Sequence, residues 1–115
     1  MKTPTTILFH ESRPEIHIRI TASINQEGKL LIEGYDSGKL VEELRGDWDY
    51  EYCMSIKKEN KELLKKKLSK ELLKTLNDEK LLVWLKENYN HNEAFSAIEF
   101  LLDRMKIPYE PFSWH

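Results

Sequence analysis

The chain has 115 residues and a mass of 13.7 kDa, with 40% hydrophobic residues, 33% charged residues and a formal net charge of −2. This composition is typical of one soluble globular domain and excludes a disordered or fibrous chain. The near balance of charges gives no general attraction to nucleic acid or to an anionic membrane, so we expect neither as a partner.

The single cysteine, Cys53, excludes an intrachain disulfide and with it the class of small disulfide-stapled secreted domains. The longest apolar run, residues 81–85, is far shorter than the ~20 residues of a membrane span. The start of the chain lacks the apolar stretch of a signal peptide, so we expect a cytoplasmic protein. No nucleotide-binding loop or zinc-binding motif occurs, and no cofactor is predicted.

The first half of the chain alternates between apolar and polar residues, as a strand with one polar face does. Residues 15–25 and 48–56 carry the clearest pattern, and 5–10 and 29–35 predict two further strands. The residues expected to point inward are Ile16, Ile18, Ile20, Ala22, Ile24, Trp48, Tyr50, Tyr52, Met54 and Ile56. Turns are expected at residues 12–14 and 25–28, and such short connections favour an antiparallel meander. Between the third and fourth strands, residues 39–44 are expected to form one or two helical turns.

From about residue 59 the apolar period becomes that of a helix. Leucines at 64, 68, 72 and 76 form a stripe, with Lys66, Lys67, Lys70 and Lys74 on the far side. Asn60 is the expected N-cap of the first helix, Asn77 or Asp78 that of the second, and Asn92 that of the third. The third helix, about residues 93–106, has a buried stripe of Ala94, Phe95, Ile98, Leu101, Leu102 and Met105, with Phe100 opposite.

Strands followed by helices predict an α+β fold: an antiparallel meander of about four strands with about three helices on one face and the other face in water. We expect a single domain over residues 1–115, strand-rich over 5–56 and helical over 59–106. The tail, 107–115, holds three aromatic residues and two prolines. The aromatic residues predict that the tail docks on the domain. Because of the prolines, any strand that it forms should be an edge strand.

Several segments combine acidic residues with glycine, histidine or aromatic residues: Phe9-His10-Glu11, Glu33-Gly34-x-Asp36-x-Gly38, Glu42-Glu43, Gly46-Asp47-x-Asp49-Tyr50-Glu51-Tyr52, Ile107-Pro108-Tyr109-Glu110 and Phe112-Ser113-Trp114. In these segments the chain resembles a family of small bacterial proteins that have no assigned activity. The resemblance covers most of the chain except residues 57–90 and implies no catalytic residues. Family members tend to carry glycine before the Ile-Pro step, where this chain has Lys106.

An acidic segment runs from Glu33 to Glu51, where seven carboxylates face only two basic residues. Its candidate binding residues are Asp36, Glu42, Glu43, Asp47, Asp49 and Glu51. Clustered carboxylates bind divalent cations, serve as acid and base, or attract a basic partner. Asp36 and Asp47 are also well placed as turn residues, and the spacing fits no EF-hand loop.

Arg19 and His17 lie on the polar side of their strand and, with Glu33, Asp49 and Glu51, form either cross-strand charge pairs or a site for a small charged ligand. His10, His17, His91 and His115 are scattered and predict no metal site. The eight lysines between 57 and 74 are expected to form a solvated helix face, because no arginine accompanies them. Cys53 has no assignable base and is expected to be structural. The aromatic strand Trp48, Tyr50 and Tyr52 is expected in the core, with a pocket lining as the alternative.

Two functions follow from this reading. The preferred one is a cytoplasmic binding module without chemistry of its own, with a protein partner at the acidic segment. An immunity protein that neutralises a toxin is one concrete form, by analogy alone. The alternative is a ligand-binding or metal-assisted hydrolase that uses Asp36, Asp47, Asp49 and Glu51. The tail leaves an edge at which a second copy can pair, but nothing in the sequence requires a homodimer.

Overall fold

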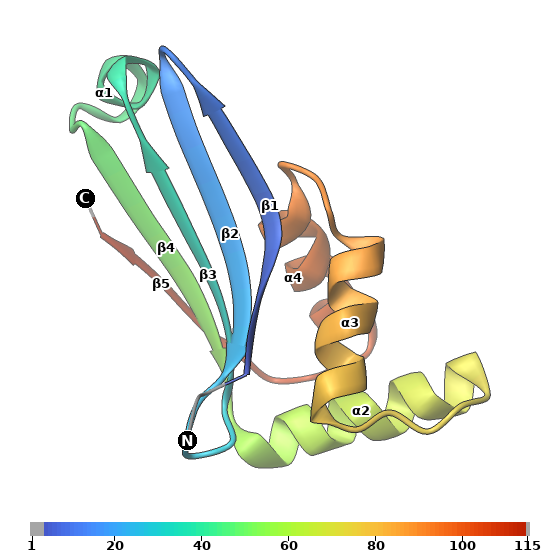
Figure 1. Ribbon diagram of the computed structural model, residues 1–115. Helices are drawn as coiled ribbons and strands as arrows, with labels where there is room; N and C mark the ends of the chain where they lie inside the picture. The colour runs from blue at the N-terminus through green and yellow to red at the C-terminus, as the bar shows by residue number, and fades with distance from the viewer. Residues whose placement is uncertain (1–3, 115) are drawn as a thin grey trace.

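The computed structural model describes residues 4–114, without the side chains of residues 112–114. Within them the chain forms five strands and four helices, which confirms the α+β class (Figure 1). The strands are β1 (Thr5–Arg13), β2 (Ile16–Ile24), β3 (Leu30–Ser37), β4 (Asp49–Ile56) and β5 (Glu110–Trp114). The helices are α1 (Lys39–Arg45), α2 (Lys58–Leu72), α3 (Asp78–Asn88) and α4 (Ala94–Arg104).

The sheet is an antiparallel meander in the order β1-β2-β3-β4-β5, as the short connections predict. The first turn lies at residues 14–15 rather than 12–14, because β1 keeps pairing with β2 as far as Arg13. The second turn forms as expected: the Asn25 side chain accepts hydrogen bonds from the backbone of Glu27 and Lys29, and Gly28 has a φ of 81°. A bulge between Ile7 and Phe9 turns Leu8 into the core.

Helices α2, α3 and α4 cover one face of the sheet, but only its half nearer α2 (Figure 1). Burial follows this cover. The fully buried inward residues are Ile20, Ala22, Ile24, Leu30, Ile32, Met54 and Ile56, and those toward α1 that are only partly buried are Ile16, Ile18, Asp36, Tyr50 and Tyr52. The expectation for Trp48 is wrong: it precedes β4, outside the alternation of the strand, and is 58% exposed.

The helices have most of the predicted inner residues, but their bounds differ. The leucine stripe of α2 ends at Leu72, and Leu76 is buried from the connection to α3. Asn77 caps α3 as expected, since its side chain accepts from the backbone N–H of Lys80. Asn60 and Asn92 are not caps: α2 begins earlier, after Lys57, and α4 begins after Glu93. In both cases the chain turns into the helix without a side-chain cap, because packing of the apolar stripe sets the start.

The lysine-rich helix α2 is not solvated along its whole length. Lys61 is 2% exposed and lies 3.0 Å from Asp78, at the start of α3. Lys65 approaches the same carboxylate at 2.7 Å and Glu62 at 2.8 Å. Lys67, expected on the far side, instead donates to the backbone carbonyl of Met105. These bonds fasten α2 to the other helices through charged groups that satisfy one another.

The tail pairs with β4 as a fifth strand, so the docked tail is an edge strand of the sheet. Pro111 lacks a backbone N–H, and it is tolerated there because one side of an edge strand makes no hydrogen bonds within the sheet. Before the tail, Lys106 takes a φ of 58°, the left-handed conformation that glycine adopts without strain. The side chains of Phe112 and Trp114, and all of His115, lie outside the described residues.

Leu73 ends α2 with a φ of 57° and is 91% exposed, so its side chain contributes little and its backbone is strained. We expect Leu73→Gly to raise the free energy of unfolding by roughly 0.5–1 kcal/mol, measured by urea denaturation. Lys70→Gly, inside the same helix, should lower it by about 1 kcal/mol. A destabilised Leu73→Gly protein would contradict the strain at this C-cap.

Candidate functional site

The end of the sheet farthest from α2 carries the acidic segment. Helix α1 is held there by backbone hydrogen bonds: Gly38 N–H donates to the Trp48 carbonyl, and Leu40 N–H to the Glu15 carbonyl. A Cβ at Gly38 would lie 2.6 Å from the Glu15 oxygen, so this close approach requires glycine. The turns around α1 are therefore fixed to the sheet and present its exposed face in one orientation.

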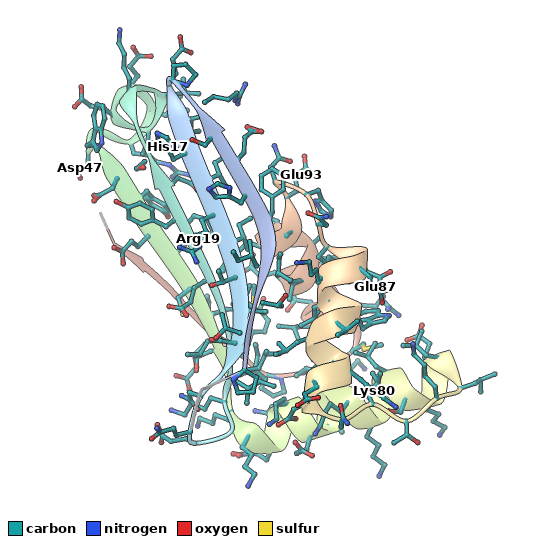
Figure 2. The ribbon with its side chains drawn as sticks, viewed as in Figure 1. His17, Arg19, Asp47, Lys80, Glu87 and Glu93 are labelled. Carbon is teal, nitrogen blue, oxygen red and sulfur yellow. The ribbon has the colours of Figure 1, made fainter. Side chains whose placement is uncertain are left out.

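We call the exposed part of this region the acidic end: Glu42, Glu43, Leu44, Asp47, Trp48 and Asp49. Figure 2 shows Asp47 beside α1. Leu44 is 74% exposed and Trp48 is 58% exposed, among carboxylates that are also exposed. A large aromatic side chain rimmed by charge is typical of the centre of a protein interface.

The predicted carboxylates divide between the two faces of the sheet. Asp36 lies on the helix side, where Tyr52 donates to it at 2.9 Å. Asp49 lies on the open side, where it accepts from the Tyr35 hydroxyl at 3.2 Å. Glu51 pairs with Tyr35 on the same open side. Within residues 4–114 no three His, Cys, Asp or Glu side chains are grouped so that they could hold a metal ion.

The open face brings together the predicted charges of β2, β3 and β4. Arg19 lies opposite Tyr35, and Tyr35 lies opposite Glu51, so the Arg19 cation stands on the β2 side and the Glu51 carboxylate on the β4 side. A shallow hollow of about 370 Å³ lies here, lined by Thr5, Arg19, Thr21, Glu33, Gly34, Tyr35, Glu51, Tyr52 and Cys53. Figure 2 shows Arg19 and His17 on this sheet. The register therefore sets Tyr35 between Arg19 and Glu51, so these two charges are not directly opposite each other across neighbouring strands.

Cys53 faces the open side, as predicted, yet is only 7% exposed. Pairing with β5 places β4 inside the sheet, between β3 and β5. Burial raises the pKa of the Cys53 thiol to about 11, and the Glu33 carboxylate adds to this shift. The thiol therefore stays protonated at neutral pH, which agrees with a structural role.

A second hollow, of about 310 Å³, lies on the helix side between the end of α1 and the start of α4, where the sequence pattern gave no sign of Arg45, Asn92 or Ser96. We call it the Asp36 hollow. Its lining is Asp36, Arg45, Tyr50, Tyr52, Asn92, Phe95 and Ser96. It exists because the helices stop short of this end of the sheet (Figure 1).

The aromatic wall of the Asp36 hollow is tightly packed. The Tyr52 ring lies over Gly34, and it meets Phe95 edge-to-face with the ring centroids 4.8 Å apart. The Tyr50 ring lies 5.6 Å from that of Tyr52. Arg45 lies over the outer Tyr50 ring, with its guanidinium carbon 4.4 Å from the centroid. The pocket-lining alternative for Tyr50 and Tyr52 thus describes their position better than a full place in the core.

The surroundings of this hollow raise the pKa of Asp36, because its loss of hydration outweighs the groups that stabilise its negative charge. Burial raises the pKa of Asp36, while the Tyr52 hydrogen bond and the Arg45 charge oppose that shift. Burial and the neighbouring Asp36 raise the pKa of Tyr52, so its hydroxyl keeps the proton and donates it. One signal in the sequence marked Asp36: it continues the alternation of Ile32 and Gly34 in phase, as an inward residue does.

A third hollow, of about 500 Å³, lies at the opposite end of the molecule, beside Lys61 and the turn at residues 25–28. Lys61 and Asp78, its most buried charges, are already paired with each other. No ligand-binding role follows from it.

Comparison with known proteins gives no assignment: no protein-family model, curated protein or solved structure matches the chain. The resemblance to a family of small bacterial proteins stays a prediction. Among the residues that the structure describes, no helix has the length and apolar character needed to cross a membrane.

A Cβ at Gly34 would lie 1.9 Å from the Tyr52 ring. We expect Gly34→Ala to lower the free energy of unfolding by roughly 1–3 kcal/mol, because the ring must move out of its packed position. In a Tyr52→Ala background the same change should cost much less. A double-mutant cycle in urea measures this coupling, and equal costs in both backgrounds would contradict the contact.

Alkylation of Cys53 by iodoacetamide should be slow at neutral pH and rise toward a midpoint near pH 11, because only the thiolate reacts. Glu33→Gln should lower that midpoint by removing the neighbouring negative charge, whereas Glu27→Gln, in the exposed turn, should leave it unchanged. Initial rates from mass spectrometry, at pH values where circular dichroism shows folded protein, give the midpoints. Identical midpoints in all three proteins would refute the role of Glu33.

Proposed function

We propose that this protein is a small cytoplasmic binding module without chemistry of its own, and that its acidic end recognises a basic surface of a protein partner. The observation that carries the proposal is the exposure of Trp48 and Leu44 among the carboxylates of the acidic end. Exposed aromatic and aliphatic groups of this size supply interface burial, and the carboxylates around them supply steering and orientation.

The attachment of the acidic end supports the same proposal. Val41 is buried on the inner side of α1, and glycines with positive φ precede and follow the helix. The Gly38 contact with Glu15 fixes the entry to α1 against the turn between β1 and β2. A surface that is already ordered loses little conformational freedom on binding, which favours affinity.

Neutralisation of a basic toxin, as by an immunity protein, is the concrete form that we favour. It needs a compact acidic surface and no catalytic group. The metal-assisted hydrolase receives no support from the geometry, since Asp36 lies on the other face of the sheet from Asp49 and Glu51.

The test uses the full chain as bait in lysate from its native host, followed by measurement of affinity for the purified partner. We expect Trp48→Ala to weaken binding at least tenfold, as the loss of a central aromatic group does. Reversal of charge at Glu43 should slow association and reduce its dependence on salt.

Glu87→Lys is the matched control, because Glu87 is an exposed carboxylate on α3, far from the acidic end (Figure 2). Its affinity should equal that of the unchanged protein. A partner that binds Trp48→Ala and the charge-reversed protein with full affinity would refute the proposal, as would equal losses in the Glu87→Lys control.

A further inference from the structure

The Asp36 hollow opens beside the acidic end, since Arg45 belongs to both α1 and the lining. Its chemistry is different from that of the exposed carboxylates around Trp48. Its lining offers one carboxylate, three aromatic rings and two small polar side chains, Asn92 and Ser96. A partner seated on the acidic end would reach this hollow with a side chain.

We propose that the Asp36 hollow receives an arginine side chain of the basic partner, and that Arg45 is a resident competitor for it. The inference rests on the proposed function, since it names the group that the partner inserts. A volume of about 310 Å³ has room for one long side chain. A planar guanidinium can stack on tyrosine rings and bond to a carboxylate, which a lysine ammonium does less well.

Asp36 is suited to this role because one of its oxygens is already fixed. The Tyr52 hydroxyl donates to Oδ1 at 2.9 Å and holds the carboxylate in place. Partial burial removes water from around the group, so an incoming cation meets a stronger field than at the exposed carboxylates. A charge-assisted bond to such a carboxylate is stronger than one to a solvated side chain.

Arg45 shows that this wall accepts a guanidinium. Its guanidinium carbon lies 4.4 Å from the Tyr50 ring centroid, and its charge acts on Asp36. The Arg45 side chain is exposed and therefore displaceable. A partner arginine would contact the Tyr50 ring and the Asp36 carboxylate in place of Arg45, whose side chain would move into water. Arg45 therefore lowers the affinity of the hollow for the partner arginine.

The probe is N-acetyl-arginine-N-methylamide, titrated into the full chain and followed by the NMR shifts of the Asn92 and Ser96 amides. Its neutral isostere, the citrulline analogue, should not bind. Arg45→Gln should tighten arginine binding roughly two- to fivefold, because a competing cation–π contact is removed. Asp36→Asn, which keeps an acceptor for Tyr52, should weaken it about tenfold.

Lys39→Gln is the matched control, since it removes the same charge from exposed α1 without touching the Tyr50 ring. It should tighten binding less than Arg45→Gln does. Equal effects of the two variants, or equal binding of the citrulline analogue, would overturn the inference. Should Asp36→Asn prove unstable, Ser96→Trp, which fills the mouth of the hollow from an exposed position, must abolish binding instead.

The two proposals fail in different ways. A partner lost by Trp48→Ala but unaffected by Asp36→Asn and Arg45→Gln would overturn the arginine hollow and leave the acidic end as the interface. Arginine binding with the expected variant pattern, together with a partner indifferent to Trp48→Ala, would support the hollow and refute the acidic end.

Discussion

The structure depends on a mismatch of length between the sheet and its helical cover. The four long strands extend beyond α3 and α4, so the apolar face is sealed at one end and open at the other (Figure 1). The inward residues change accordingly, from Ile24, Leu30 and Ile56 at the sealed end to Asp36 and Tyr50 at the open end. Burial of aliphatic side chains stabilises the sealed end. At the open end a tyrosine can be partly buried, because its hydroxyl keeps a polar partner.

Because of this mismatch, the two ends differ in whether their charged groups are paired or exposed. At the sealed end, charged groups form ion pairs between helices, as Lys61 and Lys65 do with Asp78. At the open end, charges remain exposed, and α1 adds Leu44 between them. Buried apolar side chains are therefore concentrated at the sealed end, while the charged groups of α1 and the turn after it stay exposed at the open end.

Local patterns predicted the fold well, because alternation and helical period report directly on which side chains meet the core. They placed β2 and α4 correctly and gave the antiparallel order. They failed at Trp48 because the alternation was extended to one residue before the first residue of β4. They failed at Asn60 and Asn92 because a good capping residue does not begin a helix when packing favours another start.

The sequence by itself determined the α+β class, the two-sided strands and the acidic character of residues 33–51, since composition and period are local properties. Only the tertiary structure decided that Asp36 of β3 accepts a hydrogen bond from Tyr52 of β4, and that Phe95 of α4 meets the same tyrosine ring. It also decided that Cys53 is buried and that β4 is an inner strand of the sheet. These facts depend on contacts between segments tens of residues apart, which no local pattern specifies.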